Sequence, residues 1–191
     1  HFSLISQFQI PTKYQNFHLR NLLKWKSQWG HQKLEIDLAH WKESYKYYQN
    51  IHSNFYYDGS ANTFYAKGFY QWKWKSFWNN SVQIEHKYST GHSTENPLKN
   101  ISQHITDVSW FHSLKWNENL KGEFGIKKEW SNVFKNPFLY SAAVEWKPNQ
   151  WTLGISTSKN YRTPSFNDLF WEPGGNKNLN PETSYQNEIH I

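Results

Sequence analysis

The charged side chains between positions 161 and 183 are the first candidates for binding chemistry. Arg162, Asp168 and Glu182 bring a guanidinium and two carboxylates into one predicted loop. They could contact a ligand, but ion pairs among them would equally hold the loop in shape, and an ordered loop needs such ties. We prefer the second interpretation.

Aromatic side chains in two predicted loops form the other candidate set. Tyr56, Tyr57, Phe170 and Trp171 could contact aromatic or macrocyclic ligands or sugar rings, or they could pack the loops together. The sequence shows no carboxylate pair, no Ser/His/Asp arrangement and no cluster with metal-ligand spacing. We therefore expect no catalytic residue, no metal site, no cofactor and no enzyme activity.

Large aromatic rings replace aliphatic bulk in this chain. Aromatic residues make up 19% of it, including 12 Trp, while the mean hydropathy is −0.93. A water-soluble core is built mainly from Leu, Ile, Val and Ala, which are scarce here. Trp and Tyr suit a boundary between apolar and wet surroundings, because each has an apolar body and a polar group.

Charge and chain ends restrict the class of protein further. The formal net charge is +6, but the basic residues, nearly all Lys, are scattered singly, so we expect no nucleic-acid binding. The absence of Cys excludes disulfides and Cys-based zinc sites. No apolar run is long enough for a membrane helix, and no signal peptide is evident. The chain starts at His1 within a strand pattern and contains no Met, which indicates an internal piece of a longer protein.

Apolar and polar residues alternate along nearly the whole chain, and no segment keeps a helical period. Residues 138–146 are the clearest case, with Phe138, Tyr140, Ala142, Val144 and Trp146 on one side. The pattern predicts about ten strands. Their expected ranges are 2–10, 17–29, 32–48, 63–77, 81–89, 108–116, 124–130, 138–146, 151–161 and 183–191.

The predicted connections alternate between short and long. Short ones are expected at 30–31, at 79–80 as an Asn-Asn hairpin, at 117–119 and at 148–150. Longer ones are expected at 49–62, 90–103, 132–137 and 162–183. One end of an up-and-down antiparallel sheet then carries short turns and the other end carries longer loops, as in outer-membrane barrels. The predicted fold class is an all-β transmembrane antiparallel up-and-down β-barrel.

Trp residues lie beside the predicted short turns, as an interfacial aromatic girdle requires. The set is Trp29, Trp74, Trp78, Trp116, Trp146 and Trp151. A soluble sandwich or barrel with Trp in its core is the alternative, but it gives no reason for Trp to gather at one end of the strands. His40, His86 and His112 fall on the expected lipid-facing side and depart from the pattern unless they lie near an interface.

Two sequence boxes, at 161–164 and 176–182, and the segment 165–170 after the first box identify the final long loop. Residues 161–164 read Tyr-Arg-Thr-Pro, residues 165–170 read Ser-Phe-Asn-Asp-Leu-Phe, and residues 176–182 read Asn-Lys-Asn-Leu-Asn-Pro-Glu. This resembles the TonB-dependent outer-membrane receptors, which often have aromatic-Arg-Ala-Pro, Ser/Thr-Phe-Asn-Asp/Glu-Leu and Asn-Pro-Asn-Leu-x-Pro-Glu segments. Thr163 replaces Ala and Lys177 replaces Pro. The matching positions are Tyr161, Arg162, Pro164, Phe166, Asn167, Asp168, Leu169, Asn176, Asn178, Leu179, Pro181 and Glu182.

The resemblance implies a receptor barrel in the bacterial cell outer membrane, in contact with lipid and closed by a plug domain. Such barrels have about 22 strands, so residues 1–191 would be part of the barrel domain, with the plug and the C-terminal strands outside this chain. Energy would come from TonB, acting on a box in the plug. The cargo would be a scarce small-molecule nutrient such as a ferric siderophore or cobalamin.

Other cargoes and other barrels remain as alternatives. Haem is less favoured, because haem-uptake members usually place a His between the two boxes and residues 165–175 contain none. A passive porin-type barrel would need neither plug nor double-box loop. A soluble, aromatic-rich β-sandwich binding module is the third possibility.

Overall fold

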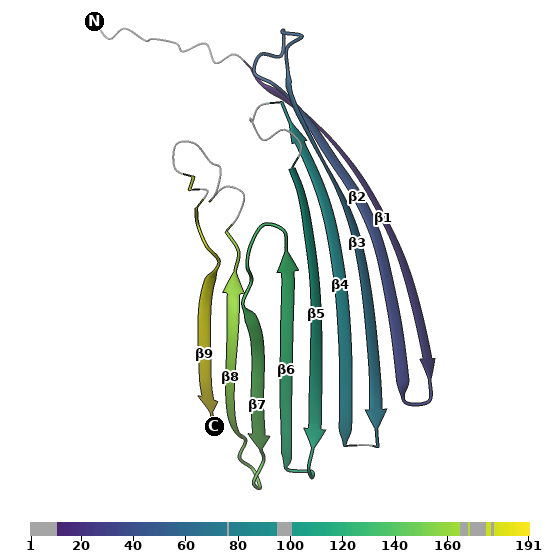
Figure 1. Cartoon of the computed structure of the whole chain (residues 1–191), viewed down its shortest axis with the longest axis vertical. Helices are drawn as coiled ribbons and strands as arrows, with labels where there is room; N and C mark the ends of the chain where they lie inside the picture. Colours follow the sequence, from purple (N-terminus) through teal and green to yellow (C-terminus); the bar gives the residue numbers. More distant parts are fainter. Residues whose placement is uncertain (1–10, 76, 95–100, 165–167, 169–174, 177) are drawn as a thin grey trace, which may run out of the picture.

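Over the residues that it describes, the computed structural model contains one antiparallel sheet of nine strands in strict sequence order (Figure 1). It describes residues 11–75, 77–94, 101–164, 168, 175–176 and 178–191. The strands are β1 (Lys13–Trp29), β2 (Gln32–Tyr48), β3 (Tyr57–Trp74), β4 (Trp78–Ser93), β5 (Ile101–Lys115), β6 (Leu120–Ser131), β7 (Phe138–Trp146), β8 (Leu153–Arg162) and β9 (Glu182–His190). The chain is therefore all-β and up-and-down, as the alternation predicts. The expected strand 2–10 lies outside the described residues.

The Asn-Asn hairpin predicted at 79–80 is wrong. Asn79 and Asn80 lie inside β4, and the connection from β3 to β4 spans residues 75–77. Trp74 and Trp78 form the last pair of this ladder, with ring centroids 5.6 Å apart. Lys75 makes the turn with a φ of 59°, a left-handed conformation that is uncommon for a residue other than Gly. Residues 75–77 contain no Gly and no Asn-Gly pair, so no hairpin signal marks this turn.

Two predicted long loops are shorter than expected. The first spans 49–56 rather than 49–62, and the second spans 94–100 rather than 90–103. Residues 59–62 pair with 42–45 of β2, and residues 90–93 pair with β3, so polar sequence continues the ladder. At the other end of the sheet, β8 begins at Leu153, which leaves Trp151 in the connection 147–152.

The connections nevertheless alternate between a shorter and a longer set as predicted, except that 132–137 and 147–152 have six residues each. The short ones join β1 to β2, β3 to β4, β5 to β6 and β7 to β8, and all lie at one end of the sheet (Figure 1). The longer connections at 49–56, 94–100, 132–137 and 163–181 lie at the opposite end. We call these the short-turn end and the long-connection end. Among the described residues no helix is both long and apolar enough to cross a membrane.

The sheet has two chemically different faces, because successive side chains of a strand point to opposite sides. One row across the register joins Trp25, Ile36, Gly68, Ile84 and Val108, and we call this side the outer face. It holds most of the exposed large hydrophobic side chains of the strands. The neighbouring row joins polar residues and defines the inner face.

Candidate functional site

A row of charged residues crosses the inner face. Register aligns Lys24, Asp37, Lys67, Glu85 and Asp107, and the row ends at Glu129 in β6. Lys24 Nζ lies 3.7 Å from Asp37 Oδ2. The charges alternate in sign from Lys24 to Glu85, whereas Asp107 and Glu129 are both acidic. The alternating half can form ion pairs within the row, and the acidic half needs cations or hydrogen-bond donors from outside the row.

The acidic half is tied to neighbouring side chains. Lys127 Nζ lies 3.3 Å from Asp107 Oδ1, and the Asp107 side chain is only 7% exposed. The side-chain amide of Asn136 donates a hydrogen bond of 2.6 Å to the Glu129 carboxylate. The same carboxylate also accepts a hydrogen bond from the Tyr161 hydroxyl. These contacts fix the carboxylates of β5 and β6 toward the inner side of the sheet.

An aromatic cluster forms on the inner face near the long-connection end. The Tyr14 ring lies 4.8 Å from the Tyr47 ring and 6.1 Å from the Tyr45 ring, measured between centroids. The Tyr45 hydroxyl is 3.3 Å from the Ser93 hydroxyl. No local sequence pattern predicts this cluster, because only the register of β1 against β2 brings residues 14 and 47 together.

The predicted ligand-contact residues divide between the two sides. Tyr57 opens β3, pairs with Tyr47, and meets Phe55 edge-on at 5.2 Å, which puts it beside the aromatic cluster. Tyr56 instead packs on Tyr48 at 5.3 Å, with Lys46 Nζ 4.5 Å from its ring. Alternation sends neighbouring side chains apart. Phe170 and Trp171 lie outside the described residues.

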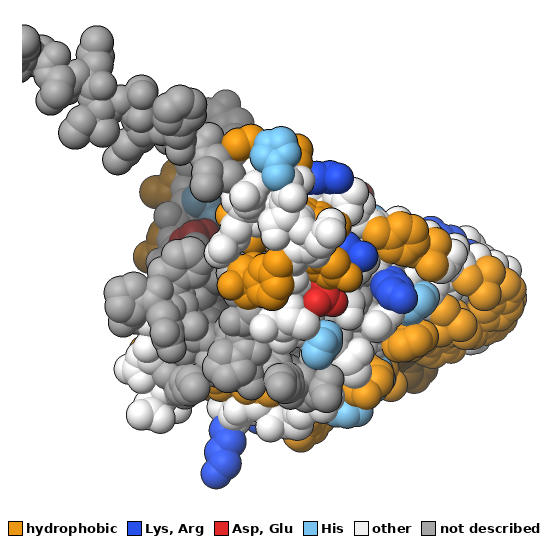
Figure 2. All heavy atoms as spheres, turned by 90° about the horizontal axis from the view of Figure 1, so that it is seen from above, with side chains coloured by type: hydrophobic (Ala, Val, Ile, Leu, Met, Phe, Trp, Pro, Cys, Tyr) orange, Lys and Arg blue, Asp and Glu red, His pale blue; other side chains and the backbone are white. Residues whose placement is uncertain are grey.

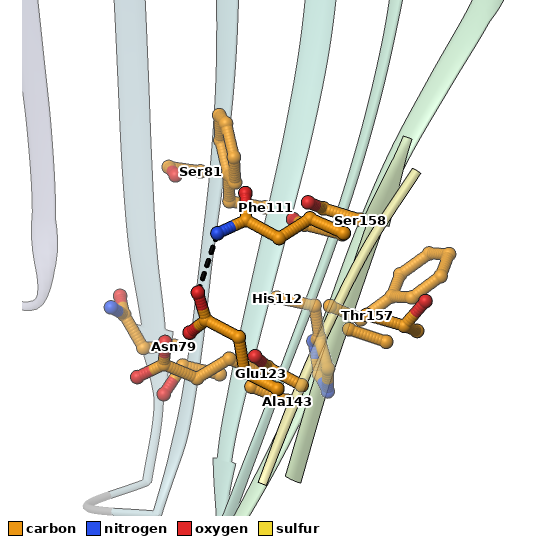
Figure 3. A pocket seen from close by; sticks show the side chains of 15 residues that line it. Asn79, Ser81, Phe111, His112, Glu123, Ala143, Thr157 and Ser158 are labelled. Atoms are coloured by element: carbon orange, nitrogen blue, oxygen red, sulfur yellow. Dashed lines mark hydrogen bonds between the residues drawn. The ribbon is translucent and has the colours of Figure 1, made fainter. Parts of the chain in front are cut away.

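A hollow of about 510 Å³ lies on the inner face toward the short-turn end (Figure 3). Small hydroxyl side chains such as Ser81, Ser141 and Ser158 line much of it, with carboxylates of Glu123 and Glu188 at its wall. Gln186 donates a hydrogen bond of 2.5 Å to Glu188. The small side chains leave room, and the oxygens present acceptors, so this surface fits a hydrogen-bonding partner.

Ion pairs and backbone hydrogen bonds order the described part of the motif loop. Arg162 lies 3.7 Å from Asp168 and 3.6 Å from Glu182, so the expected pairing among these residues is present, while their structural rather than ligand-binding role stays a prediction. The Asn176 amide donates to the Asp168 carbonyl, and the Asn176 side chain accepts from the amide of Asn178. Of the other motif positions, Phe166, Asn167 and Leu169 lie outside the described residues.

The six Trp residues gather at the short-turn end as their spacing predicts. Trp29, Trp74 and Trp146 end strands, Trp78 begins one, and Trp116 and Trp151 lie in short connections. All six are exposed, at 38% to 63%. Their role as a membrane girdle stays a prediction at this point. Within the part of the chain that the structure describes, no group of His, Asp or Glu could hold a metal ion.

Comparison with protein families agrees with this architecture. The family model described as TonB dependent receptor-like, beta-barrel, matches residues 5–191. The chain therefore belongs to the TonB-dependent receptor β-barrel family.

Two solved structures with the same fold are siderophore receptors much longer than this chain. The siderophore receptor PirA from Pseudomonas aeruginosa superposes with a TM-score of 0.79 at 10% identity, over 93% of this chain and 36% of that one. PirA from Acinetobacter baumannii gives a TM-score of 0.71 at 13% identity, over 92% and 32%. At such low identity the likeness concerns the fold alone. The chain spans about a third of the length of these receptors.

A curated relative adds a short but closer sequence match. The vitamin B12 transporter BtuB of Vibrio vulnificus (strain YJ016) is 40% identical over 57 residues, which cover 24% of this chain and 9% of that protein.

Proposed function

We propose that this chain is part of the wall of an outer-membrane receptor that takes up a scarce nutrient, such as a ferric siderophore or cobalamin, with energy from TonB. The complete barrel would have about 22 strands, and the plug with its TonB box would lie outside residues 1–191. The family match over residues 5–191 is the observation that carries the proposal. The receptors PirA and BtuB support the class of cargo without deciding between the two.

The two faces of the sheet fit opposite surroundings. The outer face would meet lipid, with Trp29, Trp74, Trp78, Trp116, Trp146 and Trp151 as a girdle at the inner, periplasmic boundary of the membrane. The inner face, with its row of charges and the hollow near Glu123 and Glu188, would surround the plug. A wet, polar lumen accounts for a mean hydropathy of −0.93 in a membrane protein.

The aromatic cluster is the best-placed ligand contact among the described residues. Tyr14, Tyr45 and Tyr47 lie on the inner face beside the long connections, which would open to the outside of the cell. Tyrosine offers an aromatic surface and a hydroxyl, so this cluster can pack on a catecholate or corrin ring and also bind its polar edge. Tyr57 extends the same surface.

Growth of a deletion strain tests the proposal. Complementation with the full-length protein should restore growth on one defined ferric siderophore, or cobalamin-dependent growth, and the effect should disappear without TonB. Uptake that persists without TonB would instead support a passive porin.

Two neighbouring tyrosines provide a matched pair of variants for the ligand site. Tyr47→Ala removes an inner-face ring, whereas Tyr48→Ala removes a ring that pairs on the other side of the same strand. We expect Tyr47→Ala to weaken ligand binding about tenfold, as the loss of one well-packed aromatic contact does. Equal affinities of the two variants would place the ligand elsewhere.

A further inference from the structure

His112 lies among aromatic side chains on the outer face at the short-turn end. Register places it in one row with Asn80 of β4 and Phe124 of β6. Its ring meets the Trp78 ring edge-on at 5.5 Å and lies 5.8 Å from the Trp110 ring, measured between centroids. Seen from the long-connection end, His side chains lie among hydrophobic ones on the described surface (Figure 2). An otherwise apolar row therefore contains one group that can gain or lose a proton.

Two side chains converge on one nitrogen of this imidazole. The Trp78 indole Nε1 lies 2.9 Å from His112 Nδ1, and Asn80 Oδ1 lies 2.9 Å from the same atom. Asn80 is only 7% exposed, so its amide is held beside the ring. An imidazole nitrogen carries either a hydrogen or a lone pair in the ring plane, and never both. The two contacts therefore cannot both be hydrogen bonds in one protonation state.

The proton on Nδ1 decides which of the two contacts forms. The indole N–H can only donate, so Trp78 bonds to Nδ1 only while that nitrogen is unprotonated. Once His112 is protonated, both ring nitrogens are donors, and two N–H groups face each other. The Asn80 oxygen can accept from the protonated nitrogen, and a hydrogen bond from a charged donor is stronger than a neutral one. One proton thus exchanges Trp78 for Asn80 as the partner of the ring.

The described surroundings of His112 hold no charge that competes for this proton. Its neighbours on the outer face of β4, β5 and β6 are uncharged, namely Trp78, Asn80, Val82, Trp110, Leu114 and Phe124. Tyr70 of β3 is titratable, but its hydroxyl donates a hydrogen bond to Gln32. Lys75, in the β3–β4 connection, holds its ammonium 5.9 Å from the centre of the Phe77 ring. Trp78 and Asn80 are consequently the polar groups that respond when the ring changes charge.

The bond between Trp78 and His112 ties one corner of the sheet together. Trp74 and Trp78 form the last pair of the β3–β4 ladder, and their rings stack at 5.6 Å with planes 9° apart. The indole N–H of Trp78 joins this stacked pair to β5, the next strand. Without that bond the pair is held by its own stacking and by the backbone ladder. Protonation of His112 would therefore give both rings more freedom to move.

We propose that His112 is a proton-operated switch at the short-turn end of the wall. In its neutral form it accepts a hydrogen bond from Trp78 and fixes the stacked pair with Trp74. In its protonated form it donates to Asn80 and releases the pair. The switch lies on the outer face, apart from the proposed cargo site on the inner face, and acts on the hold of the β3–β4 turn whatever the cargo is.

The test follows the Trp78 side chain while the pH is lowered. The full-length protein that contains this chain is labelled with 5-fluorotryptophan, and the Trp78 resonance is identified by its loss from the fluorine NMR spectrum of Trp78→Phe. Histidine is the side chain whose charge changes between pH 5 and 8. We expect the Trp78 resonance to move along a single-proton curve in this range. A resonance that does not titrate there would overturn the switch.

Matched histidine variants show which imidazole takes up the proton. Asparagine carries its side-chain oxygen one bond from Cγ, as histidine carries Nδ1, so His112→Asn can accept from Trp78 at every pH. The Trp78 resonance should then keep its high-pH position throughout. His86→Asn, on the outer face of β4 but eight residues beyond Trp78, should leave the titration unchanged. Titration that persists in His112→Asn, or disappears in His86→Asn, would contradict the assignment.

Stability gives a second measurement that leaves His112 unchanged. Trp78→Phe keeps a ring beside Trp74 but removes the indole N–H. We expect its effect on the unfolding equilibrium constant in denaturant to be about fivefold larger at pH 8 than at pH 5, the value of about one net hydrogen bond. Trp74→Phe changes the other ring of the pair and should have the same effect at both pH values. An effect of Trp78→Phe that is equal at both pH values would refute the switch.

The switch and the proposed uptake function can fail independently. TonB-dependent uptake by a receptor whose Trp78 resonance does not titrate would refute the switch and leave the transport proposal standing. A titrating Trp78 resonance in a receptor without TonB-dependent uptake would do the reverse.

Discussion

The outer and inner faces of this sheet are built from the same strands, yet they differ in both polarity and sign of charge. Ile84 and Val108 continue an apolar row on one side, while their sequence neighbours Glu85 and Asp107 continue a charged row on the other. A period of two residues is enough to place adjacent side chains in lipid and in water. The comparison shows why the chain as a whole is polar although half of each strand is suited to a membrane.

The largest expected effect comes from moving charge between the faces. Ile84→Arg should lower the free energy of unfolding by about 2–4 kcal/mol, because the guanidinium would lie within the apolar band. Gln83→Arg, one residue away on the inner face, should change it by less than about 0.5 kcal/mol. Denaturant unfolding of the full-length protein in lipid vesicles measures both, and equal costs would contradict the assignment of the faces.

A smaller effect is expected from the buried pair on the inner face. Lys127→Met leaves the 7% exposed Asp107 carboxylate without its cation. We expect a loss of about 2 kcal/mol, less than for a fully buried pair because Lys127 is 36% exposed. Addition of Asp107→Leu should recover most of it. Lys26→Met serves as the control and should cost under about 1 kcal/mol, because Lys26 is 59% exposed and Glu35 keeps its contact with Lys33.

The stability contribution of the Trp residues at the short-turn end of the outer face should depend on lipid, unlike that of inner-face residues. Trp74→Ala removes a 63% exposed ring stacked on Trp78. In lipid vesicles we expect a cost of about 1 kcal/mol, from the lost ring pair and the lost interfacial contact. In detergent the cost should be smaller. A cost that does not depend on lipid would mean that the girdle acts through ring packing only.

The smallest effect on stability is expected at Arg162 in the motif loop. Arg162 is 70% exposed, and both of its carboxylate contacts are longer than 3.5 Å, so Arg162→Ala should cost less than about 1 kcal/mol. We expect it to affect loop order and barrel stability more than ligand choice. Thermal melting together with ligand titration checks this: an unchanged melting profile with lost ligand affinity would contradict it.

Alternation and connection length were sufficient to predict the fold. The period of two in β2 follows from Leu34, Ile36 and Leu38 alternating with Glu35 and Asp37, and the predicted limits of 32–48 match those of the structure. Prediction failed where polar residues continue a ladder. Residues 59–62 have the composition of a loop, but on a wall with a wet side such residues can remain paired.

The candidate site was harder to predict than the fold. Tyr14 and Tyr47 are far apart in sequence, and no local pattern marks them as neighbours; only the complete register of β1 and β2 does. The sequence places Tyr56 and Tyr57 in the same expected loop, and two adjacent rings do not reveal that they pack on different sides of the sheet. The pairing of Arg162 with Glu182, by contrast, follows from their positions at the two ends of one loop.

The strict sequence order of the strands has a consequence for assembly. Among the described strands, each pairs only with its neighbours along the chain, so each new pairing closes a short loop and has a low contact order. The wall can then grow one hairpin at a time, with each completed strand acting as the template for the next. A defect in one strand would therefore halt growth at that strand and leave the strands paired before it intact.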